Sequence, residues 1–102
     1  MVDITGYASR LPSDGETAVG DLVRTSPGGK GSNQMIAAHR AGSEVFLIAC
    51  VGDDSAASVL NELYRENKMS TKYIRVCQGE NTGTALIQIN KTDAQNRILI
   101  IR

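Results

Sequence analysis

A glycine-rich segment carries the residues of this chain that are best suited to binding a ligand. Residues 28–33 read Gly-Gly-Lys-Gly-Ser-Asn and precede a segment with helical character. Closely spaced glycines let backbone amides approach a ligand, and the amides at the start of a helix favour oxygen-rich groups. We therefore predict an oxygen-rich ligand at this segment. The alternative is a purely structural connection between a strand and a helix, in which the glycines only permit tight turns.

Two familiar phosphate-binding loops do not fit this segment. A Walker loop requires glycine where Arg24 stands and serine or threonine directly after Lys30, where Gly31 stands. A dinucleotide-binding fingerprint requires glycine where Gln34 stands. The glycines therefore predict a different mode of binding.

The elements before the glycine segment form a hairpin in the prediction. Residues 2–9 mix β-branched and polar side chains, which favours a strand, and residues 11–15 have strong turn chemistry. Spaced apolar residues predict a second strand over 16–25. Pro27 and the glycines after it predict a loop, because proline cannot donate to a strand ladder.

The segment after the glycines reads as a helix followed by a buried strand. We predict the helix over 34–41, capped by Ser32 or Asn33 and ended by Gly42. Residues 44–51 form a near-continuous apolar run. Such a run is typical of a strand that is covered on both faces of a parallel sheet.

A second helix is predicted to begin at Asp54 or Ser55, with either Asp53 or Asp54 as its cap rather than as a metal ligand. A further short strand is expected over 72–77. Helical spacing places five apolar residues on one face: Ala56, Val59, Leu60, Leu63 and Tyr64. The polar face carries Asn61, Glu62, Arg65 and Glu66.

The last part of the chain reads as an antiparallel hairpin. Residues 83–90 alternate between apolar and polar side chains, and residues 97–101 follow after a polar turn over 91–96. Helices that alternate with strands, followed by this hairpin, predict an α/β protein with an additional antiparallel part.

Composition excludes several classes of partner. The chain has 102 residues, enough for one small domain, with 11 basic and 11 acidic residues. No basic run suits nucleic acid or an acidic membrane, and no segment is long and apolar enough to span a bilayer. We expect a cytoplasmic protein in which Cys50 and Cys77 are buried, reduced thiols.

The order of these motifs resembles the ribokinase-like (pfkB) family of carbohydrate kinases. The family's first signature combines a Gly-Gly-Lys-Gly-x-Asn loop, small residues in the next helix, a glycine, and Val-Gly-Asp-Asp after a buried strand. In this chain the matching residues are 28–34, Ala37 with Ala38, Ala41 with Gly42, and 51–54. Residues 12–17 and 82–85 look like the turns of the family's lid strands.

The resemblance implies a partial ribokinase-like α/β fold, with parallel core strands and helices plus a small β-sheet lid. The lid strands would lie at about 1–26 and 82–102, and the α/β core at about 28–77. The family normally has a core strand before Asp3 and a Gly-Ala-Gly-Asp segment after the region matched here. We therefore expect this chain to be the amino-terminal, sugar-binding portion of such a kinase, forming a single partial domain.

The resemblance also implies which residues bind the sugar. Asp3 and Asn33 would hydrogen-bond sugar hydroxyls, while the Gly29 backbone and Lys30 would line the same pocket. Carboxylates accept from hydroxyl pairs, and a carboxamide can donate and accept at once. The alternatives are a solvated strand residue for Asp3, a solvated side chain for Lys30 and a helix cap for Asn33.

The implied reaction is transfer of the ATP γ-phosphoryl group to a sugar hydroxyl, with ribose as the expected sugar and Mg²⁺ offsetting phosphate charge. The residues of the family that bind ATP and act as catalytic base have no counterpart in this sequence. We therefore expect no catalytic, cofactor-binding or metal-binding residue in this chain, and no ATP or Mg²⁺ bound to it alone. Homodimerisation through the lid strands is implied as well. The competing hypothesis is a non-catalytic sugar-binding or dimerisation module.

Overall fold

Four strands form one mixed sheet in the computed structural model, which describes all 102 residues. They are β1 (Val2–Ala8), β2 (Leu22–Pro27), β5 (Thr84–Asn90) and β6 (Asn96–Ile101). The order is β2-β1-β5-β6. β1 is antiparallel to β2 and parallel to β5, and β5 is antiparallel to β6. We call this element the four-stranded sheet.

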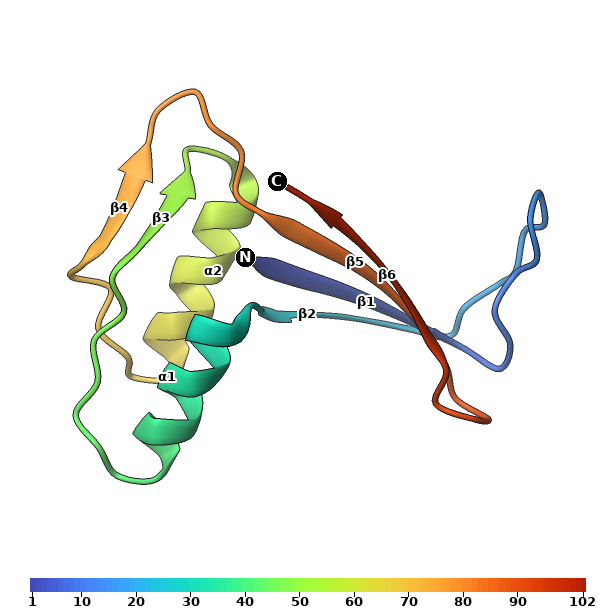
Figure 1. Cartoon of the computed structure of the whole chain (residues 1–102), viewed down its shortest axis with the longest axis horizontal. Coiled ribbons are helices and arrows are strands. Elements are labelled where there is room, and N and C mark those ends of the chain that lie inside the picture. The colour runs from blue at the N-terminus through green and yellow to red at the C-terminus, as the bar shows by residue number, and fades with distance from the viewer.

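The remaining elements form a second body, which we call the α/β unit. It contains α1 (Lys30–Arg40), β3 (Ala49–Gly52), α2 (Ser55–Glu66) and β4 (Ile74–Cys77), with β3 and β4 paired in parallel. Both chain ends and the helices lie near one end of the four-stranded sheet, whose turns project away from them (Figure 1). The radius of gyration, 15.3 Å, exceeds the roughly 13 Å of a compact 100-residue domain because of this projection. Neither helix has the length and apolar character needed to cross a membrane.

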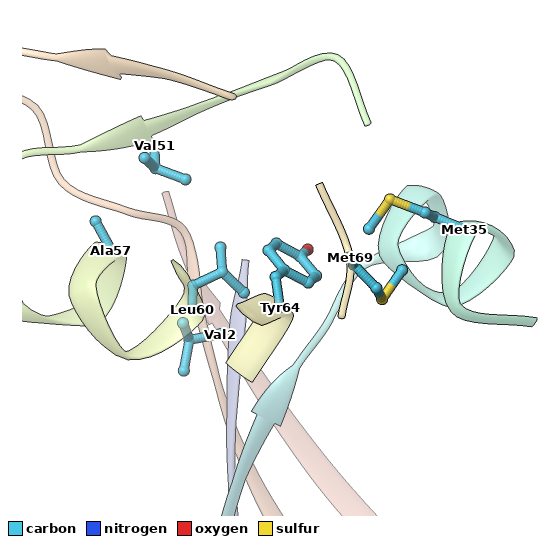
Figure 2. Close-up of a cluster of buried hydrophobic side chains, with 7 residues drawn as sticks. All are labelled: Val2, Met35, Val51, Ala57, Leu60, Tyr64 and Met69. Atoms are coloured by element: carbon cyan, nitrogen blue, oxygen red, sulfur yellow. The ribbon is translucent and has the colours of Figure 1, made fainter. Parts of the chain in front are cut away.

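The main apolar core lies in the α/β unit and at its junction with the sheet. Leu60 and Tyr64 of α2 are almost fully buried, and Val2 is the only member of the cluster from the four-stranded sheet. Figure 2 shows Val2 beside Leu60, with the two methionines on the far side of the Tyr64 ring. The complete cluster is Val2, Met35, Val51, Ala57, Leu60, Tyr64 and Met69.

Two predicted strands differ from those in the structure. The strand predicted over 16–25 is β2, Leu22–Pro27, so the loop before it is longer than expected and the strand continues into Pro27. Pro27 is tolerated because β2 is an edge strand and Pro27 is its last residue. The buried strand predicted over 44–51 is shorter, Ala49–Gly52, and Phe46 and Ile48 are exposed. The prediction of cover on both faces is wrong here because the helices cover only one face of β3.

The ends and the buried faces of the helices agree with the prediction only in part. α1 begins at Lys30 rather than 34, with Gly29 as its N-cap and no side-chain cap, so neither Ser32 nor Asn33 caps it. Gly42 does end α1: its φ is 90° and its amide donates to the His39 carbonyl (2.9 Å). In α2 the buried face is centred on Ala57, Leu60 and Tyr64, whereas Val59 is partly exposed and the buried Asn61 Oδ1 accepts no hydrogen bond.

The outer face of β3 and β4 is uncovered, which changes the expectation for the thiols. Cys50 is exposed, Cys77 is half-buried, and both are free. In the parallel register Cys50 lies opposite Arg75, so both cysteines lie on the face that carries Arg75. No disulfide joins them, and the prediction that they are buried is wrong.

Candidate functional site

The junction between the two bodies brings the start of β1 against the glycine segment. Asp3 is half-buried on β1, opposite Ser26 of β2. The Gly28 amide donates to the Met1 carbonyl (2.9 Å), and Gly28 itself is buried. A Cβ atom added to Gly28 would overlap the carboxylate of Asp3. Asp3 and the glycine segment are therefore in direct contact, although 25 positions separate Asp3 from Gly28 in the sequence.

The environment of Asp3 disfavours its charge. Partial burial raises the pKa of the Asp3 carboxyl above its usual value, and the positive chain amino terminus lowers that pKa by a smaller amount. A half-buried carboxylate that makes no ion pair within the chain retains acceptor capacity for an outside donor. Sugar hydroxyls are donors of that kind.

Gly29 makes the turn from β2 into α1. Its φ and ψ are 88° and 151°, a combination that essentially only glycine adopts. The Gly29 carbonyl accepts from the amide of Asn33 (3.0 Å), which closes the first turn of α1. The first amides of α1 consequently begin beside Gly28 and Asp3.

Lys30 and Asn33 lie on the first turn of α1, and both are exposed. The ammonium of Lys30 takes part in neither ion pair of the chain. The side chain of Asn33 does not cap the helix. Both side chains are therefore available to a ligand at this end of α1.

A cavity of about 240 Å³ lies behind the glycine segment, lined by Gly28, Gly29 and Ser32 on one side and by Ala49 and Val51 of β3 on the other. Asp3, Lys30 and Asn33 do not line it. Nine of its thirteen lining residues are hydrophobic, so its surface suits apolar groups rather than sugar hydroxyls.

Ser32 has a structural partner that the sequence did not reveal. The buried hydroxyls of Ser32 and Tyr64 hydrogen-bond to each other and so join α1 to α2. Burial raises the pKa of the Tyr64 hydroxyl, and the hydrogen bond to Ser32 lowers it by less. The hydrogen bond between the two hydroxyls holds the glycine segment against the core.

Asp54 and Thr82 form a second contact between the α/β unit and the chain that leads into β5 of the four-stranded sheet. The Asp54 carboxylate accepts from the Ala57 amide (3.0 Å), which confirms the predicted cap of α2, and also from the Thr82 amide (2.8 Å) and hydroxyl (2.7 Å). The Thr82 hydroxyl in turn accepts from the Gly52 amide (2.9 Å). These contacts lower the pKa of Asp54, the Thr82 hydroxyl contributing most. Asp53 accepts from the Gly79 amide (3.1 Å).

No group of three or more histidine, cysteine, aspartate or glutamate side chains is arranged to hold a metal ion. The contacts of Gly28 and Thr82 were not predicted from the sequence. The resemblance at residues 82–85 identified Thr82 only as part of a turn. Nothing in the sequence indicated that Gly28 lies against Asp3.

Comparison with known proteins places these features in a family. The model of the pfkB family carbohydrate kinase matches residues 1–102, the whole chain. A ribokinase from Bacillus subtilis is 36% identical over 102 residues, which are 99% of this chain and 34% of that protein. The chain therefore spans about a third of the length of this relative.

Solved structures agree with the sequence comparison. A ribokinase from Thermotoga maritima is 30% identical and superposes with a TM-score of 0.80. The matched region is 98% of this chain and 33% of the Thermotoga protein. A ribokinase from Arabidopsis thaliana, in complex with ribose and ATP, gives a TM-score of 0.77 at 29% identity over 98% of this chain and 32% of its own. The predicted mixed α/β fold, with parallel strands and two helices, is confirmed.

Proposed function

Because this chain belongs to the pfkB family of carbohydrate kinases, we propose that it supplies the sugar-binding side of an ATP-dependent sugar kinase, with ribose as the sugar. The observation that carries the proposal is the contact between the Asp3 carboxylate and the glycine segment. This contact brings an acceptor without an ion pair beside the backbone of residues 28–30 and the first turn of α1.

Each residue of the proposed site has a role that its chemistry supports. Asp3 accepts hydrogen bonds from a pair of sugar hydroxyls, and Asn33 donates and accepts through its carboxamide. The Gly29 backbone approaches the sugar closely because no side chain intervenes. Lys30 donates from its ammonium to a sugar oxygen. The four-stranded sheet then covers the sugar as a lid over the α/β unit.

ATP and Mg²⁺ belong to the proposed reaction of the whole kinase. When bound, they supply the phosphoryl group and offset the charge that develops during its transfer. The described residues do not fit Mg²⁺, because no cluster of three acidic, histidine or cysteine side chains exists to hold a cation. We therefore assign this chain the sugar side only and derive no step through the nucleotide or the metal.

The four-stranded sheet supports a proposed homodimer. The exposed fractions of Ile98, Leu99, Ile100 and Ile101 on the edge strand β6 lie between 48% and 60%. An exposed apolar edge strand is a template for pairing with another chain. A second copy of this chain is the occupant that we propose. Sedimentation velocity over a range of concentrations tests this point, and a monomer at every concentration would contradict it.

Titration calorimetry with D-ribose tests the proposed function. We expect the chain to bind D-ribose, and Asp3→Ala to weaken binding by about tenfold or more, because hydrogen bonds to charged groups contribute about 1.5–3 kcal/mol. Asp14→Ala is the matched control, since Asp14 is exposed in the loop before β2. Equal affinity of the Asp3 and Asp14 variants would exclude Asp3 from the site.

A coupled assay of ADP formation distinguishes the two remaining hypotheses. With ribose, ATP and Mg²⁺ present, we expect the chain alone to form no ADP. Ribose binding without turnover fits both the sugar side of a kinase and a non-catalytic module. ADP formation that begins only when the rest of a homologous kinase is added would favour the sugar side of a kinase. ADP formation by the chain alone would contradict the assignment of roles given above.

A further inference from the structure

Gly28 lies closer to the Asp3 carboxylate than any other residue type would allow. The antiparallel register places Asp3 opposite Ser26, and Gly28 follows Ser26 by two positions. Residues two apart on a strand point to the same face, so the side-chain direction of Gly28 is toward Asp3. An added Cβ would overlap both carboxylate oxygens and the Cγ atom of Asp3.

The backbone of Gly28 does not itself require glycine. Gly15, Gly29, Gly42 and Gly79 have positive φ angles, and Gly28 is not among them. A residue with a Cβ can adopt the backbone conformation of Gly28, so the contact with Asp3 is what excludes a side chain there. This separates Gly28 from Gly29, where the backbone itself demands glycine.

We propose that Gly28 is a positioning residue for sugar binding: its lack of a side chain leaves the space in which the Asp3 carboxylate is held toward the sugar. The inference rests on the proposed function, in which Asp3 accepts hydrogen bonds from the sugar. Gly28 acts through Asp3 and does not itself contact the sugar in this proposal.

The kind of atom that a methyl group would meet decides the consequence of a substitution. At Gly28 the obstacle is the end of a short, rotatable side chain, so Asp3 can turn away while the backbone stays. At Gly52 an added Cβ would overlap the backbone carbonyl oxygen of Glu80, which cannot move without the chain. A methyl group at Gly28 therefore displaces a binding group, whereas one at Gly52 disturbs the fold.

The first experiment compares D-ribose affinity in four variants by titration calorimetry: Gly28→Ala, Gly6→Ala, Asp3→Ala and the double variant Gly28→Ala/Asp3→Ala. We expect Gly28→Ala to weaken binding about as much as Asp3→Ala, by tenfold or more, and the double variant to be no weaker than Asp3→Ala. Gly6→Ala on β1 is the matched control, since its Cβ would lie 3.9 Å from the Ile87 carbonyl oxygen, an ordinary contact, and Gly6 is outside the proposed site. Independent, additive losses in the double variant would overturn the proposal.

Stability gives a second, sugar-independent test in the same variants. If the only obstacle to a methyl group at position 28 is the Asp3 carboxylate, the drop in Tm caused by Gly28→Ala is smaller or absent in the Asp3→Ala background. An equal drop in both backgrounds would show that the methyl group meets something else, and the proposal would fail. This test works even if Gly28→Ala alone folds poorly.

Titration of the Asp3 carboxyl by ¹³C NMR follows the displacement directly. Partial burial raises the pKa of Asp3, so turning the carboxylate into water lowers that pKa toward its usual value. We expect this decrease in Gly28→Ala and no change in Gly6→Ala. An unchanged pKa together with unchanged ribose affinity in Gly28→Ala would overturn the inference and leave the proposed function intact. Unchanged affinity in Asp3→Ala would instead overturn the sugar site, while the pKa would still report whether Gly28 holds the carboxylate.

Discussion

The α/β unit and the four-stranded sheet are stabilised in different ways. Six of the seven residues in the core cluster come from the α/β unit and the segment after α2, and only Val2 comes from the sheet. All residues of β6 are exposed, and β2 is exposed except at Pro27. The sheet therefore depends on its backbone ladder, on its junction with the α/β unit and on polar contacts at its far end, such as Lys91 with Asp21 (2.6 Å). The proposed sugar site lies where the two regions meet, which lets a well-packed unit hold one side of it and a thin sheet hold the other.

The largest effect is expected from Leu60→Ala, which removes the side chain that joins α2 to Val2. Leu60 is 2% exposed, and truncation of a buried leucine costs about 2–5 kcal/mol. Urea denaturation measures this loss. Val59→Ala on the same helix is the control, because Val59 is 39% exposed and should lose far less. Similar losses in the two variants would mean that the core does not dominate stability.

Removing either hydroxyl of the Ser32–Tyr64 pair should lower the free energy of unfolding by less than Leu60→Ala does. Ser32→Ala and Tyr64→Phe each leave a buried hydroxyl without a partner, at a cost of about 1–3 kcal/mol. We expect the double variant to lose less than the sum of the two, because no unpaired hydroxyl remains. Chemical denaturation of all three variants completes the cycle. Strict additivity would show that the two hydroxyls do not depend on each other.

The hydrogen bonds between Asp54 and Thr82 predict a dependence of stability on pH. The pKa of Asp54 is lower in the folded chain than its ordinary value of 3.8. The ionised carboxylate therefore stabilises the fold above pH 3.8, and this stabilisation is lost as pH falls through the folded pKa. Thr82→Val removes the largest cause of the shift, so we expect its Tm to lie below that of the unaltered chain at pH 6 and the gap to narrow toward pH 2.

Thr92→Val is the control for this measurement, because the Thr92 hydroxyl donates to the Ser9 carbonyl (2.9 Å) in an exposed turn. A gap between Thr82→Val and the unaltered chain that stays constant with pH would mean that Asp54 does not depend on Thr82.

The smallest effect on folding is expected in the four-stranded sheet itself. Leu99 is 60% exposed on β6, so Leu99→Thr should change the free energy of unfolding by no more than about 0.5 kcal/mol. Denaturation at low protein concentration measures this value without contributions from association. A loss as large as that of Leu60→Ala would erase the contrast between the two regions and would show that this face is covered.

Much of the element order could be predicted because it follows from local signals. Alternation located β5, and the polar turn over 91–96 followed by an apolar run located β6. Asp54 and Gly42 mark a helix start and a helix end through their own chemistry. The start of α1 could not be predicted from capping residues, because Gly29 begins the helix through its backbone conformation alone. The exposed face of β3 was missed because an apolar run shows that cover is needed but not which elements of this chain provide it.

The candidate site, too, could be predicted only in part from the sequence. The motif residues at 28–33 and Asp3 can be named from the sequence, but the sequence does not show that Asp3 meets Gly28 rather than Lys30 or Asn33. The register between β1 and β2 sets that contact, and register depends on how the whole sheet assembles.

The sequence by itself determined the family, the order of the elements and the glycine segment, because these reside in residue types and their spacing along the chain. Only the tertiary structure decided which side chains meet. The parallel pairing of β1 with β5, the hydrogen bond of Ser32 with Tyr64, and the position of Asp3 over Gly28 each join residues far apart in sequence. The physical reason is that local preferences fix backbone conformation over a few residues, whereas contacts at this site depend on strand register and core packing across the whole molecule.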